Sequence, residues 1–194
     1  MSKQLCYRSR SASICWRAGL ALIALLVGQR NAVAADAPIS REYQIKAAFL
    51  YNIPKFVEWP ADGFTDANAP IVIGVLGVNP FGDVLQTIVR DRKINGRSVI
   101  VKQVESVAEA RVSQLLFVGA NEDARFAGMR KAMEGSTVLT VGESAAFAAA
   151  GGGIRFVPVG DKLSFEINMS SVERAHLKIS SQLQKLAIAV SRTP

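Results

Sequence analysis

His176 is the only histidine of the 194 residues, and it limits the chemistry that the chain can offer. A multi-histidine metal site is excluded. A serine triad would need this one residue, without the G-x-S-x-G turn that presents the serine in many hydrolases. His176 falls in an apolar stripe, so we expect a histidine packed in the core or at an interface; a ligand contact or a pH-sensitive element is the alternative. We predict no catalytic residue, no metal site, no cofactor and no enzymatic activity.

Two other patterns invite comparison with ligand sites. Gly74, Gly77 and Gly82 lie between an apolar run and a predicted helix, but their spacing fits neither G-x-G-x-x-G nor the phosphate-binding loop with its lysine. We interpret them as a tight strand-to-helix turn. The neighbouring acids Glu122 and Asp123 precede another predicted helix, where negative charge complements the helix dipole.

The net charge of +7 comes mostly from one end of the chain. Five of the 23 basic residues, and no acid, lie in the first 34 positions, so the rest carries 18 basic and 16 acidic residues. The densest remaining basic cluster, residues 90–97, is expected to be a solvated loop. We therefore predict no nucleic-acid partner.

The first 34 residues have the three parts of a secretory signal peptide. A cationic stretch, 1–17, precedes an apolar run, 18–28, and small residues at Ala32 and Ala34 suit a signal peptidase. The run has 11 residues, whereas a membrane-spanning helix needs about 20, so a retained anchor is the weaker alternative. We predict cleavage near Ala34 and a single exported domain over 35–194, outside the inner membrane.

Both cysteines, Cys6 and Cys15, lie in this leader. The exported chain would therefore have no disulfide, thiol nucleophile or thiolate metal ligand. A domain of this length can bury enough surface to be stable without them.

Apolar periodicity predicts a first helix over 40–57, which Pro54 should kink or end. Short apolar runs then alternate with helical patterns, which is typical of a mostly parallel sheet with helices on both faces. We expect strands at 71–76, 98–104, 114–118 and 137–141, and helices at 81–90, 123–133 and 143–150.

In the last third of the sequence, the strand-like segments 154–159 and 163–168 flank Gly160-Asp161, a pair that suits a tight turn. This pattern predicts an antiparallel C-terminal hairpin. Ser170 and Glu173 then form a capping-box pattern, followed by an apolar stripe to Val190. The predicted fold class is a single α/β domain with this hairpin and a long C-terminal helix.

Four stretches of the chain resemble the YfiR-like family of secreted bacterial proteins. The segment 46–60 (KAAFLYNIPKFVEWP) is the most specific. Residues 114–118, then 140–152 with Phe147 and its glycines, and finally 165–183 also match, so the resemblance spans nearly the whole exported chain.

The resemblance implies a regulator of signalling. The best-understood members are periplasmic repressors that bind the periplasmic sensor region of an inner-membrane diguanylate cyclase and keep cyclic-di-GMP synthesis low, which disfavours biofilm. An outer-membrane lipoprotein can sequester such a repressor. Two features depart from the family pattern. The exported chain has no cysteine for thiol-based control, and Pro54 and His176 stand where small residues are usual.

A docking surface of this kind should be partly apolar and ringed by charge. The candidates lie at the end of the first helix and on the last strand and helix: Phe56, Glu58, Trp59, Glu166, Arg174, His176 and Lys178. Each has a structural alternative, since the aromatic residues could pack in the core and the charged residues could form a solvated edge or pair with Glu166.

Other functions and assemblies remain open at this point. A doubly wound sheet offers a crevice at the carboxyl ends of its strands, so a periplasmic sensor that binds a small ligand is the alternative function. A homodimer is also compatible with the apolar patterns.

Overall fold

The computed structural model describes residues 39–192. The predicted leader, with its two cysteines, lies outside these residues. In the described part of the chain no helix is both long enough and apolar enough to cross a membrane.

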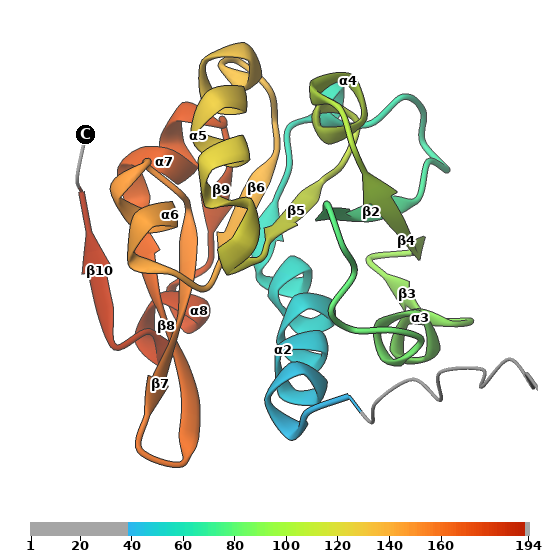
Figure 1. The fold of residues 1–194 in the computed structure, drawn as a ribbon. Coiled ribbons are helices and arrows are strands. Elements are labelled where there is room, and N and C mark those ends of the chain that lie inside the picture. The colour runs from blue at the N-terminus through green and yellow to red at the C-terminus, as the bar shows by residue number, and fades with distance from the viewer. Residues whose placement is uncertain (1–38, 193–194) are drawn as a thin grey trace, which may run out of the picture. The chain divides into compact units, whose positions relative to one another are not determined.

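An eight-stranded sheet organises the described residues, with the strand order β10-β8-β7-β6-β5-β2-β4-β3 (Figure 1). The five central strands run parallel, whereas β8 is antiparallel to β7 and β3 is antiparallel to β4. The strand bounds are β2 Ile71–Leu76, β3 Lys93–Ile94, β4 Arg97–Val104, β5 Leu115–Val118, β6 Leu139–Gly142, β7 Ile154–Val159, β8 Lys162–Asn168 and β10 Ala189–Ser191. A separate two-stranded ribbon joins β1 Val57–Glu58 to β9 Lys178–Ile179.

Helices connect the strands and flank the sheet. The α-helices are α2 Arg41–Asn52, α3 Val84–Val89, α4 Val107–Arg111, α5 Asp123–Arg130, α6 Ala145–Ala149, α7 Met169–Arg174 and α8 Ser181–Leu186. Short 3-10 helices are η1 Ile53–Phe56, η2 Ala61–Gly63, η3 Ala120–Glu122 and η4 Lys131–Met133. In Figure 1, α2 lies between α3 and the β7–β8 hairpin.

Side chains that alternate along the strands create two cores. Leu115 and Phe117 of β5 pack with α2, α3 and α8, whereas Leu116 and Val118 pack with α4, α5 and α6. The predicted arrangement, a mostly parallel sheet with helices on both faces, is therefore confirmed. So is the hairpin, in which Val159 pairs with Lys162 across a two-residue turn.

The predicted long C-terminal helix is wrong. The chain instead forms α7, β9, α8 and β10. α7 stops because His176 adopts a left-handed conformation with φ +56°. The N–H of Leu177 then donates to the carbonyl of Val172 at 3.1 Å, and the N–H of His176 donates to that of Glu173 at 3.0 Å. This is a Schellman motif, and Val172 and Leu177 are both buried beside it.

Close packing explains the glycines of the 140–152 segment. A Cβ built on Gly142 would lie 2.4 Å from the ring of Phe147, and one built on Gly152 would lie 2.1 Å from it. Phe147 is fully buried, so its ring occupies the volume that side chains at 142 and 152 would need. The two glycines therefore let α6 lie directly against β6 and the start of β7.

Candidate functional site

An apolar groove of about 400 Å³ runs between α2 with η1 on one side and α8 on the other. Phe49 lines the groove and makes edge contacts with Phe156 and Phe165, with ring centroids 5.8 and 5.9 Å from its own. The other lining side chains are mainly apolar: Ile45, Ala48, Ile53, Phe56, Leu183 and Leu186, with Arg41, Gln44 and Asn52 at the polar positions.

The sequence of α2 explains why one of its faces stays open. Ser40 caps the helix by accepting a hydrogen bond from the N–H of Tyr43 at 3.4 Å. Ala47 and Leu50 are fully buried in the core, which leaves Phe49 half-buried on the neighbouring face. α2 ends at Asn52, and Pro54 thus interrupts the predicted helix, as expected. The chain continues as the 3-10 helix η1, whose last residue, Phe56, also lines the groove.

The last described segment carries exposed apolar side chains, and one of them lines this groove. Leu186 lines the groove and is 64% exposed. Ile188 and Val190, which follow it, are 51% and 45% exposed. Exposed apolar side chains that adjoin a groove are typical of a surface that binds another molecule.

Three of the sequence-predicted candidates meet beside this groove. In the β1–β9 ribbon, Glu58 pairs with Lys178, so the two charged side chains are direct cross-strand neighbours and both are exposed. The N–H of Ser180 donates to the carbonyl of Phe56 at 2.9 Å. The ribbon therefore fixes the end of α2 to the start of α8, which are the two walls of the groove.

The other candidates lie elsewhere. Trp59 packs against Phe64, with ring centroids 6.4 Å apart, and its buried indole N–H has no acceptor among the described residues. Glu166 accepts hydrogen bonds from Arg155 at 2.7 and 3.0 Å, so its partner is neither Arg174 nor Lys178.

His176 does not pack in the core. The residue is exposed and lies at the left-handed turn that ends α7. Arg174, two residues earlier, lines a separate pocket between α5 and α7. The seven candidates therefore do not form one surface.

A buried ion pair, which the sequence analysis does not single out, lies at the carboxyl edge of the sheet. Lys46 of α2 contacts Glu143, which follows β6, and also Glu42 at 2.5 Å. The hydroxyl of Tyr43 and the N–H of Ala120 donate to one oxygen of Glu143 at 3.1 and 3.0 Å. Lys46 and Glu143 belong to the matching segments 46–60 and 140–152, which is the one sequence signal that could have indicated them.

The electrostatics of this cluster favour its charged form. Burial would lower the pKa of Lys46, but the hydrogen bonds to Glu143 and Glu42 outweigh burial and raise the pKa above its ordinary value. Burial, and then the charge of Glu143, raise the pKa of Tyr43. The ammonium group is therefore held as a charge, and the hydroxyl is held as a hydrogen-bond donor.

This cluster occupies the place where doubly wound proteins often bind ligands. The strand order reverses between β2 and β5, and the cluster lies beyond the carboxyl ends of β5 and β6. A cavity of about 270 Å³ remains there, but Tyr43 and Lys46 form part of its lining. The main polar group at this edge, the carboxylate of Glu143, is thus already paired with side chains of α2. The cluster therefore stabilises the attachment of α2 to the sheet.

The described residues do not contain a group of three or more His, Cys, Asp or Glu side chains that could hold a metal ion. The arrangement that they do provide is an open apolar groove beside an ordered ribbon.

Comparison with known proteins relates this fold and its motifs to others. A conserved domain protein from Vibrio cholerae O1 biovar eltor matches 77% of the chain and 60% of its own length, with 11% identity and a TM-score of 0.52. An ABC domain from Streptococcus pneumonia, in complex with L-Trp, matches 76% of the chain and 60% of its own length, with 13% identity and a TM-score of 0.47. The chain thus spans less than two thirds of either structure. Because the sequence identity to the Vibrio cholerae protein is this low, the likeness shows only a similar fold.

No curated protein matches the sequence. A family model described as YfiR/HmsC-like does match, over residues 43–188, which include most of α2, the Lys46–Glu143 pair, the β1–β9 ribbon and all of α8. The chain belongs to the YfiR/HmsC-like family.

Proposed function

We propose that the chain is exported to the periplasm, loses its leader near Ala34, and represses an inner-membrane diguanylate cyclase by binding the cyclase's periplasmic sensor region. The observation that carries this proposal is the apolar groove of α2 and α8, whose lining, apart from Arg41, lies within the family-matched residues. Regulation by docking needs no reactive group on the chain, only a surface that a partner can cover.

The groove suits an apolar segment with acidic residues beside it. Phe49, Phe56 and Leu186 offer the kind of buried aromatic and aliphatic contacts that dominate interface energies. Arg41 lines one end, and Lys185 is exposed on α8. An acidic flank on the cyclase segment would complement these cations and would speed association.

Deleting the gene should raise cyclic-di-GMP in the cell, and the intact gene should restore the low level. The Leu186→Arg variant should fail to restore it, because it places a charge in the groove. Val112→Arg is the matched control: Val112 is 59% exposed, similar to Leu186, but follows α4 on the other face. The groove proposal fails if both variants restore the low level, or if neither variant does while both are folded.

A pull-down with the purified periplasmic region of the cyclase tests the contact itself. The original chain and Val112→Arg should retain this region, and Leu186→Arg should lose it. Retention by Leu186→Arg would place the contact elsewhere. An outer-membrane lipoprotein that sequesters the repressor should compete for the same groove, so an excess of it should release the cyclase region.

A homodimer formed through the groove is the competing occupant. Sedimentation of the original chain and of Leu186→Arg distinguishes the two cases. If the Leu186→Arg substitution converts a dimer to a monomer and leaves cyclic-di-GMP low, the groove serves self-association and the repressor surface lies elsewhere.

A periplasmic sensor that binds a small ligand, without cyclase repression, is the second candidate function. A separate pocket between α5 and α7 favours it. Unchanged cyclic-di-GMP after gene deletion, together with ligand binding by the purified chain, would support this second function.

A further inference from the structure

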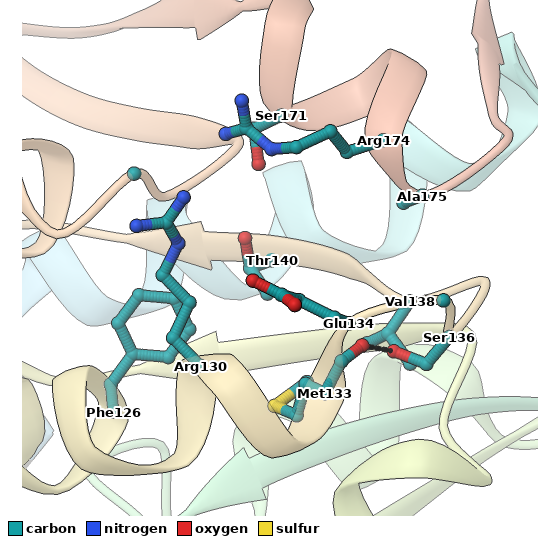
Figure 2. Close-up of a pocket in the computed structure, with 12 residues that line it drawn as sticks. Phe126, Arg130, Met133, Glu134, Ser136, Val138, Thr140, Ser171, Arg174 and Ala175 are labelled. Carbon is teal, nitrogen blue, oxygen red and sulfur yellow. Dashed lines mark hydrogen bonds between the residues drawn. The ribbon is translucent and has the colours of Figure 1, made fainter. Parts of the chain in front are cut away.

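A pocket of about 290 Å³ lies apart from the groove and shares no lining residue with it. The end of α5 with η4 forms one wall, and α7 forms the other (Figure 2). Its apolar side chains Phe126, Met133 and Val138 belong to the core that also contains Leu116 and Val118. A cavity of this size is close to the smallest pockets that bind small molecules.

Two arginines from different elements enter this pocket. Figure 2 shows the guanidinium groups of Arg130, from α5, and Arg174, from α7, extending from opposite walls into the same space. The guanidinium of Arg130 lies against the backbone at Gly151, where a built Cβ would be 2.8 Å from its Cζ. Packing thus holds this group beside the cavity.

These two cations form no salt bridge with any carboxylate of residues 39–192, in contrast to Arg155, which pairs with Glu166 at 2.7 Å. Two guanidinium groups that face one space repel each other, and an anion placed between them would remove that cost. Guanidinium groups also bind carboxylate and phosphate oxygens in pairs of hydrogen bonds.

The other polar groups of the lining also suit an anion. The Thr140 hydroxyl accepts a hydrogen bond from the N–H of Gly153 at 2.9 Å, so its own hydrogen can be donated toward the cavity. Ser171 adds a second hydroxyl. Glu134 is the one carboxylate of the lining. Both Glu134 and Arg174 are exposed, and with two arginines against one glutamate the lining carries a net positive charge.

We infer that this pocket binds a small organic oxyanion, a carboxylate or a phosphate ester, whose short apolar group lies on Phe126, Met133 and Val138. Arg130 and Arg174 hold the anionic group from two sides, and Thr140 and Ser171 donate hydrogen bonds to it. The inference does not depend on the repressor role, because the pocket and the groove have no lining residue in common.

Calorimetric titration of the purified exported chain tests the inference with benzoate and phenyl phosphate, which share an apolar ring and differ in the oxyanion. Benzyl alcohol, which is neutral, and inorganic phosphate, which lacks the ring, are the ligand controls. At least one of the two aromatic anions should bind. The better of them identifies the oxyanion, and both controls should bind at least about tenfold more weakly.

Arg130→Gln and Arg174→Gln should each weaken binding by at least about tenfold, because each removes a charge-assisted contact. Lys131→Gln is the matched control: Lys131 adjoins Arg130 in the chain, is exposed and does not line the pocket. The inference is overturned if neither aromatic anion binds at about 10 mM. Equal affinity for benzyl alcohol, or an equal loss in all three variants, would also overturn it.

Amide chemical shifts of the unmodified chain supply a test that needs no variant. Addition of the bound anion should shift the amide signals of Gly151 and Ser171. Shifts confined to the carboxyl edge near Ala120 and Glu143, or to α2, would place the ligand elsewhere and overturn the assignment.

Discussion

Lys46 and Glu143 are 97 positions apart in the chain, and their side chains form an ion pair in which the lysine side chain is 5% exposed and the glutamate side chain 10%. This contact joins α2, the first described helix, to the segment that follows β6. Since α2 also forms one wall of the groove, the ion pair helps to hold that wall in place.

Replacing Lys46 by Met should destabilise the fold by about 3 kcal/mol, because Glu143 would keep its buried charge without a cation. Urea unfolding of the purified chain measures this loss. The double variant Lys46→Met with Glu143→Gln should recover part of it, since no unpaired charge remains. A double variant whose loss equals the sum of the two single losses would show that the residues are not coupled.

Stability should fall in alkaline solution. The pKa of Lys46 is raised above 10.5 and that of Tyr43 above 10.0 in the folded chain. The folded state therefore holds these protons more tightly than the unfolded state. Their contribution to stability is complete below about pH 10 and is lost as the pH rises through the two raised values. The free energy of unfolding, measured from about pH 8 to about pH 11, a range set by these pKa values, should show this decline. The Lys46→Met substitution should make the decline with pH shallower.

Gly152→Ala should cost about 2 kcal/mol, because the new methyl group meets the buried ring of Phe147. Gly128→Ala, in the middle of α5, has open space around it and should instead stabilise the chain by up to about 1 kcal/mol. Thermal unfolding compares the two. Smaller side chains at 147 should rescue Gly152→Ala, and a Gly152→Ala variant as stable as the original would contradict the close packing.

Substitutions of His176 should change stability according to the backbone conformation that the new residue prefers, and not according to its charge. His176→Gly should stabilise α7 by about 1 kcal/mol, because glycine adopts the left-handed conformation without strain. His176→Val should destabilise it, since a β-branched side chain disfavours a positive φ. Denaturant unfolding at pH 8 provides the comparison. If the valine variant is the more stable one, the Schellman end of α7 is not what positions this residue.

Local patterns predict the strands and most helices well, because each depends on neighbouring residues. The apolar run at 71–76 is β2 with the same bounds, and the turn at Gly160-Asp161 joins β7 to β8 as expected. The end of the chain fails for a definite reason. The spacing of Val172, Ile179 and Leu183 fits one continuous helix, but it also fits two short helices separated by the turn at His176.

The site is harder to predict than the fold, because it depends on contacts between distant segments. Phe56, Glu58 and Lys178 can be proposed from the sequence and do meet in the β1–β9 ribbon. By contrast, no spacing rule brings Lys46 to Glu143 or Arg130 to Arg174, since neither pair shares an element.

The contacts of Phe49 have a consequence for the order of folding. Its aromatic neighbours Phe156 and Phe165 lie more than a hundred positions later, so α2 cannot complete its packing until the last third of the polypeptide is available. Contacts of such long sequence separation slow folding.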